Sequence, residues 1–118
     1  MPHNQQLGRF GETIAAGWLK KNGYKILARN FRCPDGEVDL VAEIGGVIHF
    51  VEVKSRTSRI CGWPEEAVGE EKLEAIAAAA ENFLEQKNLE ADWQIDIISL
   101  IFSRKTKTAR LWWLENIS

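Results

Sequence analysis

The segment from Gly36 to Arg56 decides the fold. It reads Gly-Glu-Val-Asp-Leu-Val-Ala-Glu-Ile, then Gly45-Gly46, then Val-Ile-His-Phe-Val-Glu-Val-Lys-Ser-Arg. Two alternating, β-branched runs separated by Gly-Gly predict a β-hairpin with a two-residue turn. Such a turn fixes the register, so that Ile44 lies opposite Val47 and each earlier residue of the first strand pairs with the matching later residue of the second.

This register places acidic side chains opposite one another. Asp39 falls opposite Glu52 and Glu37 opposite Lys54, all on one face of the hairpin. Directly opposed side chains lie roughly 4.5–5.5 Å apart, so two carboxylates repel unless a positive charge lies between them. A divalent metal ion meets this need better than Lys54 alone. The alternative is a solvated sheet face on which these charges have no function.

Helical and strand patterns surround the hairpin. Residues 5–22 and 65–88 carry apolar residues at helical spacing, and Gly23 ends the first helix. Strands are predicted over residues 24–31, 94–102 and 109–114. Because the strand from Gln94 follows a long helical crossover, we expect it to run parallel to a neighbour. The second face of the hairpin is expected to be buried, and its residues are Val38, Leu40, Val51 and Val53.

Length and composition bound the class of protein. The 118 residues suggest one domain over 1–118, of α/β class, with a mixed five-stranded sheet flanked by helices in the order α-β-β-β-α-β-β. No apolar run approaches a membrane span, and the N-terminus lacks a signal-peptide pattern. Cys33 and Cys61 fit no metal or redox spacing, so two reduced thiols and no zinc site are expected.

The charge is unevenly distributed along the chain. The formal net charge is −2, which does not by itself indicate nucleic-acid binding. Residues 1–62 carry nine basic and six acidic residues, whereas residues 63–103 carry two basic and ten acidic residues. A basic surface can therefore exist away from the second helix. The alternative is that the basic residues only keep the surface soluble.

The acidic residues resemble a known nuclease pattern. An acid in the first helix, then Asp39, about a dozen residues, and then Glu52-Val53-Lys54 is similar to the PD-(D/E)xK nuclease superfamily. Within it the chain resembles the YraN-like family of bacterial proteins, which is compared with archaeal Holliday-junction resolvases. The matching positions are Gly11-Glu12, Gly23-Tyr24, Asn30, Arg32, residues 36–41, residues 50–56, Gly62, Pro64, Ala67 and Lys72. The literal Pro34-Asp35 pair lies too early, and Asp39 follows Val38 rather than a proline.

The resemblance implies a restriction-endonuclease-like core and a metal-dependent hydrolysis of phosphodiester bonds in DNA. It assigns Asp39 and Glu52 as ligands of Mg²⁺, for which Mn²⁺ can substitute, with the Val53 carbonyl as a third ligand. Lys54 would orient the attacking water or stabilise charge on the phosphate. Glu12 would assist through water or a second metal. The resemblance also implies a cytoplasmic protein and, more weakly, a substrate of branched or junction DNA.

Several further residues are expected around this site. Glu37, opposite Lys54, is expected to hold the amine of that lysine in place. Trp63 lies in the predicted loop beside the site and is a candidate for stacking on a base. Candidates for phosphate contact are Tyr24, Arg29, Arg32, Arg56, Arg59 and, as a weaker one, Lys72. Taken singly, each of these cations is more simply a solvated surface charge.

Two other functions stay open at this level. One is a non-catalytic nucleic-acid-binding or scaffolding protein on the same fold. The other is a protein-interaction module, in which the adjacent Trp112 and Trp113 point to opposite strand faces and one of them forms a homodimer contact. Trp18 and Trp93 are expected in the core. His49 falls on the apolar face of the hairpin, where the sequence offers no catalytic partner for it.

Overall fold

The computed structural model describes residues 4–57, 69–103 and 105–117. The elements follow the predicted order, which confirms an α/β fold with five strands and two flanking helices. The predicted start of the second helix, at residues 65–68, lies outside the described residues. The bounds are α1 Asn4–Lys21, β1 Lys25–Cys33, β2 Gly36–Ile44, β3 Val47–Arg56, α2 Glu70–Gln86, β4 Asp92–Ser103 and β5 Thr108–Leu114.

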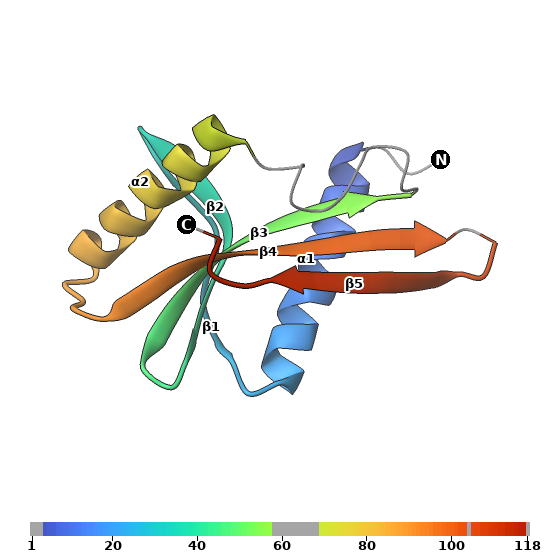
Figure 1. Cartoon of the computed structure of the whole chain (residues 1–118), viewed down its shortest axis with the longest axis horizontal. Coiled ribbons are helices and arrows are strands. Elements are labelled where there is room, and N and C mark those ends of the chain that lie inside the picture. Colours follow the sequence, from blue (N-terminus) through green and yellow to red (C-terminus); the bar gives the residue numbers. More distant parts are fainter. Residues whose placement is uncertain (1–3, 58–68, 104, 118) are drawn as a thin grey trace.

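The strands form one mixed sheet in the order β1-β2-β3-β4-β5. β3 and β4 run parallel, and every other neighbouring pair is antiparallel. The parallel pair arises because α2 lies between β3 and β4 in the chain and carries the chain back along the sheet. This confirms the parallel neighbour predicted for the strand from Gln94. Figure 1 shows α1 passing behind the strands and α2 beside β1 and β2.

The predicted hairpin register is confirmed near the turn and ends halfway along the strands. Ile44 pairs with Val47, and the ladder continues to Leu40 and Val51. Gly45 and Gly46 both have positive φ, at 58° and 79°, as a two-residue turn with the twist of the flanking strands requires.

Beyond this point the sheet forks. β2 stays paired with β1 as far as Gly36, whereas β3 stays paired with β4 as far as Arg56. The two arms separate in Figure 1, where β2 and the end of β3 run to opposite sides of the view. The expected direct pairing of Asp39 with Glu52, and of Glu37 with Lys54, is therefore absent from the β2–β3 ladder. The reason is that here β2 stays paired with β1, and β3 with β4, instead of with each other.

The sheet buries one apolar cluster under each helix. The cluster under α1 contains Ala15, Ala16, Leu19, Leu40, Ala42, Val51, Ile98 and Leu100, with Val53 packed against it. The cluster under α2 contains Val38, Val41, Ile48, Phe50, Ile76, Ala79, Ala80, Phe83 and Ile95. None of the helices in the described ranges is long and apolar enough to cross a membrane.

The expectation that Val38 shares a buried face with Leu40, Val51 and Val53 is wrong, because Val38 packs under α2. The alternation changes at Asp39. In β1, Asn30 has a φ of 52° and lies between the residues that pair with Leu40 and Val38. This left-handed residue rotates the ladder locally. On either side of Asp39, Val38 therefore faces α2 and Leu40 faces α1.

Two glycines let the helices lie directly on the strands. A Cβ at Gly11 of α1 would lie 1.7 Å from the Ser55 Oγ, and a Cβ at Gly36 would lie 1.9 Å from the Ala75 carbonyl oxygen. The second contact joins the start of β2 to the backbone of α2. It fixes the first turns of α2 against the fork.

We expect Gly36→Ala to destabilise the protein by about 1–3 kcal/mol, because a backbone carbonyl of α2 must move to admit the new methyl group. The measurement is the free energy of unfolding in urea. Gly17→Ala in α1 is the matched control, since nothing lies within 4 Å of a Cβ there. That control is expected to raise stability by up to about 1 kcal/mol, as alanine favours a helix. Equal stability of Gly36→Ala and the wild type would contradict the close contact.

Candidate functional site

The fork places a carboxylate between its two arms. Asp39, on β2, accepts a hydrogen bond from the Val53 N–H of β3 through Oδ2, at 2.7 Å. Because the β2–β3 ladder ends at Val51, this N–H has no ladder partner on β2. The side chain of Asp39 thus takes the place of a backbone carbonyl. Its position is set by the backbone of β3.

Glu52 lies next to this hydrogen bond and is buried, with 3% of its surface exposed. Burial raises the pKa of Glu52 to about 8, and a hydrogen bond and charge repulsion from Asp39 add to the shift. Lys72 acts in the opposite direction without cancelling these effects. At neutral pH Glu52 therefore favours its protonated form.

Two lysines approach Glu52 from different elements. The Lys72 Nζ, from α2, lies 3.2 Å from the Glu52 Oε2, and the Lys54 Nζ, from β3, lies 4.0 Å from the same oxygen. Partial burial opposes the charge on Lys72, but Glu52, Glu37 and Asp39 outweigh it and the pKa of Lys72 is raised. Lys72, a weak candidate in the sequence, thus lies closer to Glu52 than Lys54 does.

The predicted role of Glu37 is corrected by the structure. Its carboxylate forms ion pairs with the Lys72 Nζ at 3.7 Å and the Arg32 Nε at 3.4 Å, and not with Lys54. The reason is the fork. The β2–β3 ladder ends at Leu40, so Glu37 does not lie beside β3 and its side chain lies between β1 and α2. Glu37 therefore holds a different lysine from the one predicted.

Glu12 reaches the fork from α1. Its pKa is raised by partial burial and by Asp39, against the lowering effects of a hydrogen bond with Asn30 and the charges of Arg29 and Arg32. The helices cover opposite faces of the sheet, and Asp39 interacts electrostatically both with Glu12 of α1 and with Glu52 of β3. The fork thus brings the three predicted acids into one electrostatic group.

Two hollows flank this acidic group, and Arg32 lines both. One has a volume of about 380 Å³ and is lined by Gly8, Arg9, Glu12, Asn30 and Arg32. The other, also of about 380 Å³, is lined by Arg32, Cys33, Pro34, Asp35, Gly36, Glu37, Lys72 and Ala75. Arg9 was not predicted as a site residue, although it lies three residues before Glu12 and so shares its helix face.

The remaining phosphate-contact candidates fall in different places. The Arg29 guanidinium donates to the Thr13 Oγ1 at 3.2 Å and lies near Glu12. Arg56 is half-buried at the end of β3. Tyr24 is not brought to the site, because its ring packs on His49 and Trp113, with centroids 5.2 and 5.5 Å away. Arg59, Cys61 and Trp63 lie outside the described residues.

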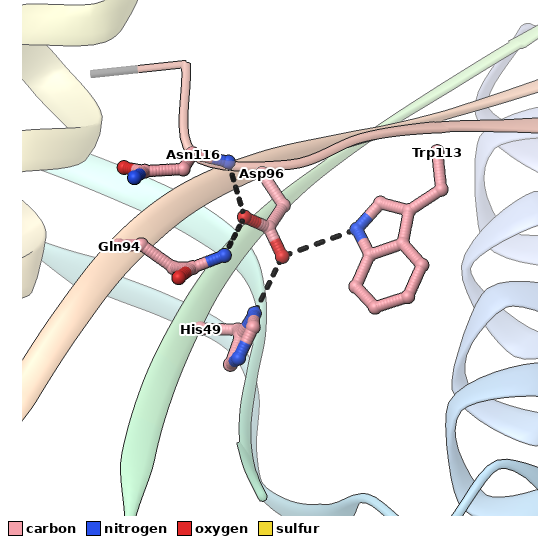
Figure 2. A network of polar contacts seen from close by, with 5 residues as sticks. All are labelled: His49, Gln94, Asp96, Trp113 and Asn116. Carbon is pink, nitrogen blue, oxygen red and sulfur yellow. Dashed lines mark hydrogen bonds and ion pairs between the residues drawn. The ribbon is translucent and has the colours of Figure 1, made fainter.

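A second polar cluster, drawn in Figure 2, was not predicted from the sequence. Asp96 of β4 is fully buried, and its Oδ2 lies 2.6 Å from the His49 Nδ1. The Trp113 indole N–H donates to the same oxygen at 3.1 Å. The Gln94 amide and the Asn116 backbone N–H both donate to Oδ1, at 2.9 Å. An aspartate inside a strongly apolar strand was the available signal, since a buried charge needs partners.

Ligand atoms of His49, Asp96 and Glu115 lie within 4.8 Å of one another, which is close enough for a metal site. The hydrogen bonds favour a structural role. Each oxygen of Asp96 already contacts two polar groups, so its acceptor capacity is used by the protein. The Ile117 N–H also donates to the Ile95 carbonyl at 2.9 Å. Asp96 therefore fastens the segment after β5 to β4.

Comparison with known proteins identifies a family. The family model described as "Uncharacterised protein family UPF0102" matches residues 11–100. A UPF0102 protein of Geobacter metallireducens is 48% identical over 102 residues, which cover 86% of this chain and 84% of that protein. One of Caldicellulosiruptor saccharolyticus is 38% identical over 115 residues, or 97% and 98% of the two chains. The chain therefore belongs to family UPF0102, which confirms the YraN-like resemblance.

Asp96→Asn should lower the free energy of unfolding by about 2–4 kcal/mol, because an amide NH₂ group would face donors that need an acceptor. Urea denaturation measures the change. Glu115→Gln is the matched control: Glu115 is exposed, and its substitution should change stability by less than about 0.5 kcal/mol. A loss equal to that of the control would show that Asp96 does not anchor the chain end.

The raised pKa of Glu52 predicts a specific pH dependence of stability. Since the folded protein keeps a proton that the unfolded chain releases near pH 4.5, the free energy of unfolding should fall as pH rises from about 5 to about 8. The slope from this one group is at most about 1.4 kcal/mol per pH unit. Glu52→Gln should remove this component. Parallel stability curves for the wild type and Glu52→Gln across this window would contradict the shift.

Proposed function

We propose that this member of family UPF0102 is a metal-dependent nuclease that hydrolyses phosphodiester bonds in DNA. The observation that carries the proposal is the Asp39–Glu52 pair at the fork, with two lysine amines within 4.0 Å of Glu52. A buried acid beside a second acid destabilises the folded state, so its presence supports a functional role. Such perturbed groups cluster at catalytic sites.

The donor set suits a hard divalent cation. Asp39 and Glu52 offer carboxylate oxygens close enough to share a hydrogen bond, and oxygen ligands of this kind fit Mg²⁺, with Mn²⁺ as a substitute. Mg²⁺ needs only one or two protein carboxylates and completes its shell with water and phosphate. When bound, it lowers the pKa of a water ligand and polarises the phosphate. Asp39 is kept in position by the Val53 N–H, so its carboxylate does not have to be ordered on binding.

The remaining roles are assigned to the chain's own side chains. Lys54 would stabilise the negative charge that develops on the phosphate, since its amine is partly exposed beside Glu52. Glu12, positioned by Asn30, would orient a water molecule. Arg29 and Arg32 border the acidic group and would contact phosphates on either side of the cleaved bond.

The preference for branched or junction DNA rests on the resemblance to resolvases. A non-catalytic nucleic-acid-binding or scaffolding protein is the second candidate. The net charge of −2 favours instead the third alternative, a protein-interaction module. A homodimer stays a prediction. Trp113 packs edge-on against Trp18 with centroids 5.1 Å apart, so this member of the predicted Trp pair contributes to the fold itself.

Purified protein should cleave DNA when Mg²⁺ or Mn²⁺ is present, and linear, flapped and four-way DNA should be compared as substrates. Asp39→Asn should abolish cleavage and also abolish the Mn²⁺-induced rise in melting temperature, because a metal ligand is lost. Lys54→Ala should keep the Mn²⁺ effect and most of the DNA affinity, yet cleave about a hundredfold more slowly or worse.

Lys87→Ala is the matched control, because Lys87 is an exposed lysine at the far end of α2. It should bind metal, bind DNA and cleave as the wild type does. If Lys54→Ala cleaved as fast as this control, the activity would come from another site or from contamination. DNA binding without cleavage by the wild type would favour the non-catalytic candidate.

A further inference from the structure

Lys72 occupies an unfavourable position for a cation. It is the third residue of α2, where the positive end of the helix dipole repels a basic side chain, and the acids Glu70 and Glu71 precede it in the same turn. It is nevertheless half-buried, with 33% of its side chain exposed. A cation in this place needs strong partners, and Glu52 at 3.2 Å and Glu37 at 3.7 Å provide them.

The position of Lys72 is fixed by the backbone around it. Ala75, one helical turn later, has its carbonyl oxygen packed against Gly36 at the start of β2. The amine therefore approaches the fork from a rigid support, while its long side chain keeps several rotatable bonds. Small rotations of this side chain can move the amine without moving α2.

Glu37 joins Lys72 to a second cation. Its carboxylate contacts the Lys72 Nζ at 3.7 Å and the Arg32 Nε at 3.4 Å, and all three side chains line the same hollow of about 380 Å³. Arg32 is mostly exposed, with 77% of its side chain accessible. The hollow thus presents two cations beside the acidic group, held together by one carboxylate.

A divalent cation at Glu52 would change the balance of forces on Lys72. The metal ion and the Lys72 amine would compete for the Glu52 Oε2, and their positive charges would repel at short range. Lys72 would then lose its closest partner. A phosphate group in the adjacent hollow can replace that partner, because lysine donates well to phosphate oxygens as a point charge.

We propose that Lys72 is a transferable counter-ion: it pairs with Glu52 and Glu37 in the metal-free protein and turns to a DNA phosphate when a divalent cation takes Glu52. This inference rests on the proposed nuclease function. It makes Lys72 a phosphate-binding residue that couples metal binding to DNA binding. Lys54, on β3, has the separate role of stabilising charge at the reacting phosphate.

The test is the effect of Ca²⁺ on DNA affinity, measured by fluorescence anisotropy of labelled DNA in Ca²⁺ and in EDTA. Wild-type protein should bind DNA more tightly in Ca²⁺. In Lys72→Met this gain should be smaller by about three- to tenfold, because a phosphate contact formed only in the Ca²⁺ state is missing. Loss of one positive charge weakens binding in both conditions, so the ratio of the two affinities isolates the contact.

Lys87→Met removes the same charge at the other end of α2 and should keep the full wild-type ratio. Lys72→Arg should restore most of the coupling, and Lys72→Gln serves as the second neutral variant if Lys72→Met is poorly folded by circular dichroism. A wild-type ratio in both neutral variants would overturn the counter-ion proposal and leave the nuclease proposal intact. If Ca²⁺ failed to raise the DNA affinity of the wild-type protein, the counter-ion proposal would be overturned; if the wild-type protein bound neither Mn²⁺ nor DNA, the nuclease proposal would fall as well.

Discussion

The hydrogen bond from the Val53 N–H to the Asp39 carboxylate is the interaction on which the candidate site depends. Where β2 and β3 separate, each strand loses a row of backbone partners, and a buried N–H without an acceptor destabilises the fold. Asp39 supplies the acceptor at 2.7 Å. An acid is thereby fixed beside the buried Glu52 for a reason of backbone hydrogen bonding. The hydrogen bond that satisfies the backbone at the fork therefore also places the two acids next to each other.

The site concentrates charge that the fold must balance. Glu52 is buried next to another acid, and burial is the largest cause of its raised pKa. Cations from separate elements gather around this group, among them Lys54 on β3, Arg32 on β1 and Lys72 on α2. Apolar side chains of similar size would satisfy the same space at lower electrostatic cost. The acids at the fork therefore carry an electrostatic cost that Lys72 offsets only in part.

The sequence predicts local features and misses those that depend on distant elements. Gly45-Gly46 sets the register as far as Leu40 and Val51, because turn geometry acts on its own strands. The end of that ladder depends on β1 and β4, which compete for the same strands, so Glu37 acquires Lys72 instead of Lys54. The partner of His49 could not be predicted for the same reason, since Asp96 is 47 residues away in the chain.

Asp96 and Glu52 show how two buried acids of one sheet can serve different ends. Both have at most 3% of their surface exposed. The oxygens of Asp96 meet four polar partners, two on each, and this geometry leaves no acceptor for a cation. Glu52 instead faces another carboxyl group and the amines of two lysines, whose side chains can move. A buried acid with fixed donors stabilises the fold, whereas one held by movable cations and a second acid keeps the donor set that the proposed metal site requires.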